Sequence, residues 1–168
     1  MSDTRVSWDT TFMDMCKIIA KRSTCIKLQT SAILVSQENN IVSIGYNGSP
    51  SKQIHCNEYW NVIAEQDHIS LQTLCTDVHF RMYHHEWSLR HELHAEMNAL
   101  LRCHSPIDNL TLYTLYSPCI QCAKGIVSFA NIKKVIYLYP YIRDFEDSMT
   151  LLELNNILVE PFTYKNDL

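Results

Sequence analysis

The fold and the chemistry of this chain are decided by the stretch HAEMNALLRCHSPIDNLTLYTLYSPCIQC, residues 94–122. The imidazole of His94 and the thiolates of Cys119 and Cys122 are ligands that suit zinc. Three protein ligands leave the fourth tetrahedral position open for water, as in a catalytic zinc site. Glu96 lies two residues after the histidine, so its carboxylate can approach that water without ligating the metal and can carry protons.

Both ends of this stretch have the pattern of a helix start. Apolar residues recur at helical spacing after His94 and again after Pro118. Pro118 suits the first helical position, with Ser117 as the cap. The partial positive charge at a helix amino terminus favours the thiolate form of Cys119 and Cys122, which is the form that binds metal.

A CxxC pair alone has other interpretations, namely a redox-active pair or half of a structural zinc site with four cysteines. In residues 94–122, however, H-x-E, P-C-x-x-C and the helical context coincide. This combination is typical of the zinc-dependent deaminases. The sequence therefore favours a catalytic zinc site over either alternative.

Length and composition indicate an ordinary globular protein of 168 residues, 46% hydrophobic and 19% charged. We expect one domain over residues 1–168, with a sizeable core. The formal net charge of −4 gives no overall basic surface for nucleic acid, and no apolar run is long enough to span a membrane. The seven cysteines, an odd count without a signal-like amino terminus, predict the reducing cytosol rather than a secreted disulfide scaffold.

Hydrophobic periodicity outside residues 94–122 predicts alternating strands and helices. Two strands joined by a turn at Asn39-Asn40 predict an antiparallel hairpin. The whole pattern predicts an α/β fold, a three-layer α/β/α sandwich in which helices cover both faces of a mixed five-stranded sheet. Besides the two metal-binding helices, the expected elements are helices at about 8–22 and 144–155 and strands at 31–35, 41–46, 110–116, 134–139 and 157–162.

The segment at about 47–92, before the first metal-binding helix, is predicted to be an insertion. A structureless loop of this length is unusual inside a compact domain, and residues 57–74 have a loose helical pattern. The remainder is rich in histidine and acidic residues. We expect it to form a wall of the active site.

Three segments together resemble the deoxycytidylate (dCMP) deaminases of bacterial viruses: HAEMNA at 94–99, SPCIQCAK at 117–124 and GYNGSP at 45–50. The resemblance runs from about residue 8 to residue 164. It implies the cytidine deaminase-like fold and the hydrolysis of dCMP to dUMP and ammonia, a reaction that feeds dTTP synthesis. It also implies a homohexamer that is activated by dCTP with Mg²⁺ and inhibited by dTTP.

The same resemblance assigns roles to single residues. His94, Cys119 and Cys122 match the zinc ligands of that family, and Glu96 matches its proton-transferring residue. The residues that match its substrate contacts are Asn47, Ala95, through its backbone, and Tyr141, and the segment Gly45, Tyr46, Asn47 and Gly48 resembles part of its effector site.

The virus-type members also imply a second, structural zinc site. Its ligands map onto Cys25, Cys56 and a histidine of the insertion, for which His84 is the best match. From the residues alone, the two cysteines could equally be buried apolar side chains, which is the usual fate of free cysteine. Other histidines compete for the third position: His55, His79 and His85.

One departure from the family concerns the phosphate of the substrate. Many members carry a basic residue just before the first strand, where this chain has Gln29. Lys27 lies two residues earlier, on the same face of an extended chain, and could replace that charge. The phosphate count of the substrate therefore stays open.

Several alternatives remain at this stage. Related zinc deaminases act on dCTP, free cytosine, cytidine or a tRNA adenosine, although the tRNA enzymes need a basic surface. A zinc-stabilised binding module without catalysis is a further alternative, but it would have no use for Glu96. The ligand set would also accept iron or another divalent metal.

Overall fold

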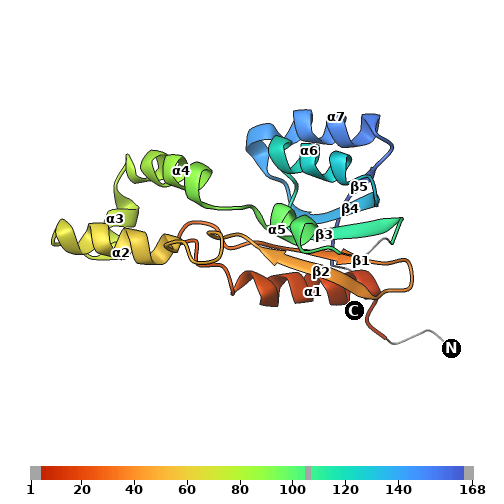
Figure 1. Ribbon diagram of the computed structural model, residues 1–168, viewed down its shortest axis with the longest axis horizontal. Helices are drawn as coiled ribbons and strands as arrows, with labels where there is room; N and C mark the ends of the chain where they lie inside the picture. The colour runs from red at the N-terminus through yellow and green to blue at the C-terminus, as the bar shows by residue number, and fades with distance from the viewer. Residues whose placement is uncertain (1–4, 105–106, 165–168) are drawn as a thin grey trace.

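Figure 1 shows the computed structural model of the protein, which describes residues 5–104 and 107–164. Its sheet has five strands: β1 (Ser31–Val35), β2 (Ile41–Tyr46), β3 (Leu110–Tyr116), β4 (Ile132–Tyr139) and β5 (Leu158–Pro161). Their order is β2-β1-β3-β4-β5. β1 pairs antiparallel with both β2 and β3, whereas β3, β4 and β5 run parallel. The predicted hairpin and the predicted mixed five-stranded sheet are therefore confirmed.

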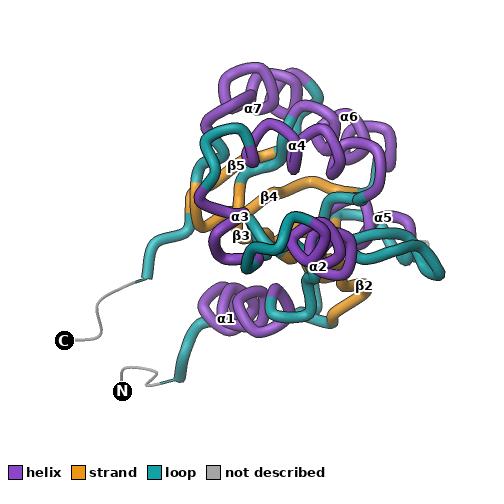
Figure 2. The backbone as a smooth tube through the Cα atoms, turned by 90° about the vertical axis from the view of Figure 1, so that its left-hand side faces the viewer, coloured by secondary structure: helices purple, strands orange, loops and turns teal. Residues whose placement is uncertain are grey.

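Helices cover both faces of the sheet, as predicted. Helix α1 (Trp8–Ala20) lies on one face, and α5 (Ala95–Leu101), α6 (Ile120–Phe129) and α7 (Phe145–Leu154) lie on the other (Figures 1 and 2). All five residues of β1 are buried because this strand is covered on both sides. Ala32 and Leu34 pack toward α5 and α6, while Ile33 and Val35 pack toward α1.

The insertion is helical over most of its length. It forms α2 (Cys56–Gln66), α3 (Leu71–Thr76) and α4 (Phe80–His91), which project to one side of the sheet in Figure 1. The sequence indicated a helix only near 57–74, and α4 was missed. The reason is that α4 buries a histidine, His84, together with Phe80 and Trp87, so it lacks a uniformly apolar face. In the described part of the chain, every helix is too short or too polar to cross a membrane.

Candidate active site

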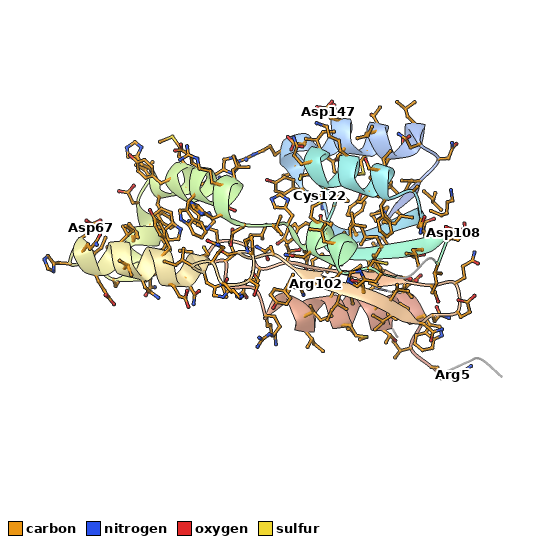
Figure 3. All side chains as sticks on the ribbon, in the orientation of Figure 1. Arg5, Asp67, Arg102, Asp108, Cys122 and Asp147 are labelled. Atoms are coloured by element: carbon orange, nitrogen blue, oxygen red, sulfur yellow. The ribbon has the colours of Figure 1, made fainter. Side chains whose placement is uncertain are left out.

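His94 and the two cysteines of the PCxxC segment meet where α5 and α6 begin. His94 is the N-cap residue of α5 and Cys119 is the N-cap residue of α6. Nδ1 of His94 lies 3.3 Å from Sγ of Cys119 and 3.4 Å from Sγ of Cys122. One nitrogen and one sulfur on a tetrahedral zinc ion are separated by about 3.5 Å, given the usual bond lengths. The three atoms therefore fit a single zinc ion, and Figure 3 shows Cys122 on the side of α6 that faces α5.

The start of α6 differs from the predicted one. The helix begins at Ile120 with Cys119, in an extended conformation, as its cap, so the placement of Pro118 at the first helical position was wrong. Ser117 does not cap the helix because its Oγ accepts a hydrogen bond of 2.7 Å from the backbone N–H of Tyr141. This bond holds the segment after β4 against the residues that lead into the metal cluster.

Glu96 lies in the first turn of α5, directly beside this cluster. It is only 5% exposed, and its Oε2 accepts a hydrogen bond of 3.5 Å from Sγ of Cys122. Burial raises the pKa of Glu96 above its ordinary value, although the nearby His94 acts in the opposite direction. A buried carboxyl group with a raised pKa can both accept and release a proton near neutral pH, as an acid–base catalyst must.

The two cysteines of the cluster share one proton. A hydrogen bond from Cys122 lowers the pKa of Cys119 to about 4, whereas the same bond and burial raise the pKa of Cys122. Cys119 is therefore a thiolate at neutral pH. Because a metal ion binds thiolates, its binding would release the remaining proton.

The segment 45–48 is packed against α5. Gly48 and Leu93 exchange backbone hydrogen bonds of 3.1 and 2.9 Å, and the side chain of Asn98 donates to the carbonyl of Tyr46. A Cβ atom on Gly45 would lie 2.1 Å from the carbonyl oxygen of Ala95, so no larger residue fits there. Gly45, which the resemblance placed in the effector site, thus has a packing role that the sequence did not indicate.

Asn47, within this segment, and Ala95, at the start of α5, are both buried. Oδ1 of Asn47 accepts from the backbone N–H of Thr30 at 2.9 Å, and Nδ2 donates to the carbonyl of Leu28 at 2.8 Å. The amide of Asn47 therefore fixes the loop before β1. Ala95 has no exposed surface, so the predicted contact of its backbone with a pyrimidine stays a prediction.

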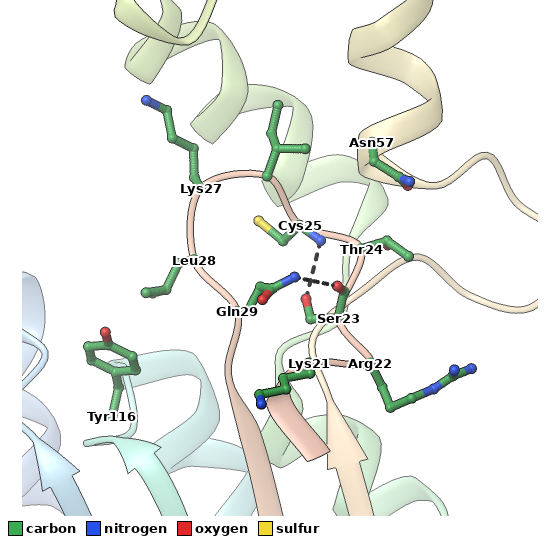
Figure 4. A pocket seen from close by; sticks show the side chains of 11 residues that line it. Lys21, Arg22, Ser23, Thr24, Cys25, Lys27, Leu28, Gln29, Asn57 and Tyr116 are labelled. Carbon is green, nitrogen blue, oxygen red and sulfur yellow. Dashed lines mark hydrogen bonds between the residues drawn. The ribbon is translucent and has the colours of Figure 1, made fainter. Parts of the chain in front are cut away.

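A basic cavity of about 750 Å³ lies beneath that loop. Its cationic side chains are Lys21, Arg22 and Lys27, and its lining also includes Asn57 and Tyr116 (Figure 4). The ammonium of Lys27 donates to the carbonyl of Cys75 in the insertion at 3.2 Å. Lys27, predicted to contact the substrate, is thus directed toward the insertion, and its contact with a phosphate stays a prediction.

The insertion brings together a second group of metal ligands. Nε2 of His84 lies 3.5 Å from Sγ of Cys25 and 3.3 Å from Sγ of Cys56, which are tetrahedral spacings. A hydrogen bond from Cys56 lowers the pKa of Cys25 to about 4, so this pair also holds a thiolate. The ligand atoms of these residues and of Glu92 all lie within 4.8 Å of one another.

Glu92 was not predicted as a member of this group. Its Oε2 accepts from Ser88 at 2.6 Å, whereas its Oε1 is buried and has no hydrogen-bond partner among the described residues. Such an orphaned buried oxygen is a natural ligand for a cation. The sequence carries no signal for this role, although Glu92 lies only two residues before His94 and so ties the two clusters together along the chain.

The competing histidines lie elsewhere. Within the described residues, His55 and His79 cap α2 and α4 and are not part of either cluster. His85 accepts a hydrogen bond from Nη1 of Arg143, whose separation from Nε2 is 2.6 Å. Burial, together with the positive charges of Arg143, His84 and His94, lowers the pKa of His85.

Comparisons with known proteins show the family of this chain. The family model described as "Cytidine and deoxycytidylate deaminase zinc-binding region" matches residues 6–139. ComE operon protein 2 of Bacillus subtilis (strain 168) is 31% identical over 168 residues, covering 93% of this chain and 77% of that protein. The deoxycytidylate deaminase of Enterobacteria phage T2 is 32% identical over 152 residues, covering 78% of this chain and 79% of that enzyme.

A solved structure extends the comparison to three dimensions. The dCMP deaminase from the cyanophage S-TIM5, in complex with dCMP and dUMP, superposes with a TM-score of 0.68 at 25% sequence identity. The match covers 95% of this chain and 100% of that one. By sequence and by fold, this chain is an enzyme of the cytidine and deoxycytidylate deaminase family.

Proposed function

We propose that this protein catalyses the hydrolytic deamination of dCMP to dUMP and ammonia, with zinc held by His94, Cys119 and Cys122. The observation that carries the proposal is the buried carboxylate of Glu96 beside a cluster to which the described part of the chain contributes three ligands. A purely structural zinc site has four protein ligands and needs no such carboxylate. The substrate is inferred from the phage T2 and cyanophage S-TIM5 relatives, both of which are dCMP deaminases.

In this mechanism Glu96 moves the protons. Zinc in the cluster supplies a water molecule whose pKa is lowered toward neutrality. Glu96 takes a proton from the water that attacks C4 of cytosine and gives it to N3 of the ring. It then takes the second proton of that water, from the new hydroxyl on C4, and gives it to the amino group, which leaves as ammonia. Its burial keeps bulk water from exchanging that proton, and its raised pKa makes the return transfer favourable.

The predicted substrate contacts surround this reaction centre. The backbone of Ala95 would contact the pyrimidine edge, because Ala95 is the first residue of α5 and lies between His94 and Glu96. Tyr141 lies close to the phosphate and sugar in our proposal, and its backbone is already fixed to Ser117. Asn47 would contact the nucleoside or hold the loop that does so, since its amide bonds to that loop.

We further propose a structural zinc ion on Cys25, Cys56, His84 and Glu92. Two sulfurs, one imidazole nitrogen and one carboxylate oxygen complete a tetrahedral set with no open position. This closed set would make the second ion structural, in contrast to the first.

We also propose how the enzyme is regulated and how it assembles. We infer activation by dCTP with Mg²⁺ and inhibition by dTTP, with the effector site at Gly45–Gly48, in a cytosolic homohexamer. Support comes from the likeness to the phage enzyme in sequence. The free thiols of both clusters also suit a reducing compartment.

The test is the loss of cytosine absorbance with dCMP, CMP, deoxycytidine and dCTP, each with and without dCTP–Mg²⁺ or dTTP. We expect turnover of dCMP that is the fastest of the four and is suppressed by dTTP. Ammonia release, measured in parallel, separates deamination from binding.

Two other results would contradict the proposal in different ways. A preference for dCTP would keep the chemistry but change the substrate, in keeping with the departure at Lys27 and Gln29. No turnover of any nucleotide by the zinc-loaded protein would leave a tRNA-directed deaminase or a non-catalytic zinc module as the function.

A further inference from the structure

Two of the cysteines in the second cluster come from separate segments of the chain and meet there as a pair. Cys25 lies in the loop between α1 and β1, and Cys56 is the first residue of α2. Both are free thiols, and their sulfur atoms lie within 4.8 Å of each other. A disulfide bond is about 2 Å long, so a shift of about 3 Å at most would join the two sulfurs. Because Cys25 is in a loop, that shift requires no movement of a helix or strand.

A small molecule can reach this pair from one side. Cys25 lines the cavity of about 750 Å³, and Figure 4 shows its side chain among those around that cavity. Cys56 has no exposed surface. The thiols of the catalytic cluster, Cys119 and Cys122, are not among the residues that line this cavity. An oxidant in the cavity would therefore meet Cys25 first, with Cys56 as the sulfur that can react next.

The other two members of the second cluster belong to a different element. His84 is a residue of α4, and Glu92 is the C-cap residue of that helix. Nε2 of His84 lies within 3.5 Å of both sulfurs, and the carboxylate of Glu92 completes the group. A metal ion would tie α4 to both α2 and the loop before β1. A bond between the two sulfurs would tie only that loop to α2.

We propose that Cys25 and Cys56 form a site of reversible oxidation by peroxides, at which a disulfide bond replaces the ligation of a metal ion and removes the anchor of α4. This site goes beyond the proposed deaminase function and does not depend on its substrate. The aromatic contacts of Trp87 with Tyr59 and Trp60 remain after oxidation. Helix α4 should therefore open more often, rather than unfold with the whole chain.

The reaction consumes one peroxide for each disulfide. The sulfur of Cys25 attacks one oxygen of hydrogen peroxide, the O–O bond breaks, and the thiol proton leaves with the other oxygen as water. The sulfur of Cys56 then attacks the sulfenic acid at Cys25, so that the S–S bond forms and the S–O bond breaks. The departing hydroxyl takes the proton of Cys56 and leaves as a second water. Two thiols thus lose two electrons, which reduce the peroxide.

Oxidation and metal binding exclude each other at this site, because a metal ion binds thiolates and a disulfide has none. When a zinc ion is bound, the two protons of the reaction come from solvent, and the ion is released. Reduction by a thiol restores both sulfurs and with them the ligand set.

The experiment treats the zinc-loaded protein with hydrogen peroxide, blocks the remaining thiols and maps disulfides by mass spectrometry. We expect a disulfide between Cys25 and Cys56 that dithiothreitol reverses, with release of one zinc ion per chain. Amide hydrogen exchange should become about tenfold faster in α4, and should change less in α2, which the disulfide retains. The absence of this disulfide, a disulfide confined to Cys119 and Cys122, or irreversible oxidation of Cys25 alone would overturn the proposal.

Matched variants test the role of each sulfur. Cys56→Ser removes the second thiol, so oxidation of Cys25 should stop at the sulfenic acid, which dimedone traps. Cys103→Ser is the control and should form the disulfide as the unaltered protein does, because Cys103 belongs to neither cluster. Cys75→Ser tests a competitor, since Cys75 is partly buried against the same aromatic residues. If Cys75→Ser prevents formation of the disulfide, Cys75 is the partner of Cys25 and our proposal is wrong. Mapping of the unaltered protein decides the case if Cys56→Ser fails to fold.

Failure of the structural zinc proposal can be told apart from failure of this inference. If the protein binds a single zinc ion per chain, the disulfide between Cys25 and Cys56 should still form, but no zinc should leave with it. Turnover of a nucleotide does not enter the experiment, so an error in the proposed substrate leaves its result unchanged.

Discussion

The two metal-ligand clusters of this protein are built from similar residues, but they lie in different structural surroundings. The cluster of His94, Cys119 and Cys122 sits where two helices begin, and both helices pack on the main sheet. The cluster of Cys25, Cys56, His84 and Glu92 sits among a small group of aromatic residues in the insertion. We therefore expect the first cluster to keep its scaffold without metal, whereas a metal ion at the second cluster would help to hold the insertion together.

The two clusters also differ in ligand number, three in the first and four in the second, and this difference fits their surroundings. A preorganised scaffold can leave one position of the metal open for chemistry, because the protein does not depend on the metal for its shape. A region with a small core gains most from a closed set of four ligands, which converts binding energy into folding energy. We expect substitutions at the first cluster to lower mainly the rate of turnover, and substitutions at the second cluster to lower mainly the free energy of unfolding.

Replacing Glu96 by alanine should have the largest effect of all. The variant should retain both metal ions and its fold but lose about 10³–10⁴-fold in kcat, because the proton carrier is gone. Ammonia release and zinc content, measured on the same preparation, check both halves of this expectation. Glu65→Ala, on the exposed surface of α2, is the control and should behave as the unaltered enzyme. Near-normal turnover by Glu96→Ala would remove our mechanism.

Replacing Cys56 by serine should lower metal content and stability, which Glu96→Ala leaves unchanged. We expect the zinc content to fall by one ion per chain and the free energy of unfolding to fall by roughly 3 kcal/mol, since a metal site is lost. Amide hydrogen exchange should show the loss concentrated in α2 and α4, while α5 and α6 remain protected. Cys103→Ser is the control, because Cys103 belongs to neither cluster. A uniform loss of protection over the whole chain would contradict the view that the second cluster stabilises the insertion alone.

The same division explains what could be predicted from the sequence. The residues of the catalytic cluster lie within residues 94–122, where the H-x-E and P-C-x-x-C spacings directly predict a zinc site. The strands and helices around this stretch alternate along the chain as in other α/β proteins. Of the second cluster, Cys25 and Cys56 came from a resemblance rather than from spacing, because the ligands are spread over residues 25–92. Glu92 was missed because an isolated acidic residue carries no pattern until the fold buries it beside two thiols.

The one local error at the start of α6 had an equally physical cause. Ser117 looked like a helix cap, but its hydroxyl accepts a hydrogen bond from the backbone of Tyr141, which is distant in sequence. At Gly45 the structure adds a requirement that the sequence did not indicate, the close approach of α5, and the effector role of this residue stays a prediction. At both positions a tertiary contact acts on a residue whose local pattern did not show it.

The smallest of the expected effects tests the scaffold of the catalytic cluster directly. Gly45→Ala would place a Cβ atom 2.1 Å from the carbonyl oxygen of Ala95 and 2.4 Å from the backbone nitrogen of Ala99. Because both neighbours are backbone atoms of α5, the helix itself must move. We expect a loss of about 2 kcal/mol in the free energy of unfolding, within the range known for overpacked cores.

Gly48→Ala is the matched control for this substitution. Its Cβ atom would meet only the hydroxyl of Thr24 at 3.6 Å, which is an ordinary contact, so its stability should hardly change. Urea unfolding curves of the two variants measure the difference. Since α5 carries Glu96 and has His94 as its N-cap residue, Gly45→Ala should also slow turnover without releasing the proposed zinc ion of the insertion. Equal stabilities for the two glycine variants would mean that the packing of α5 on β2 does not hold the catalytic cluster in place.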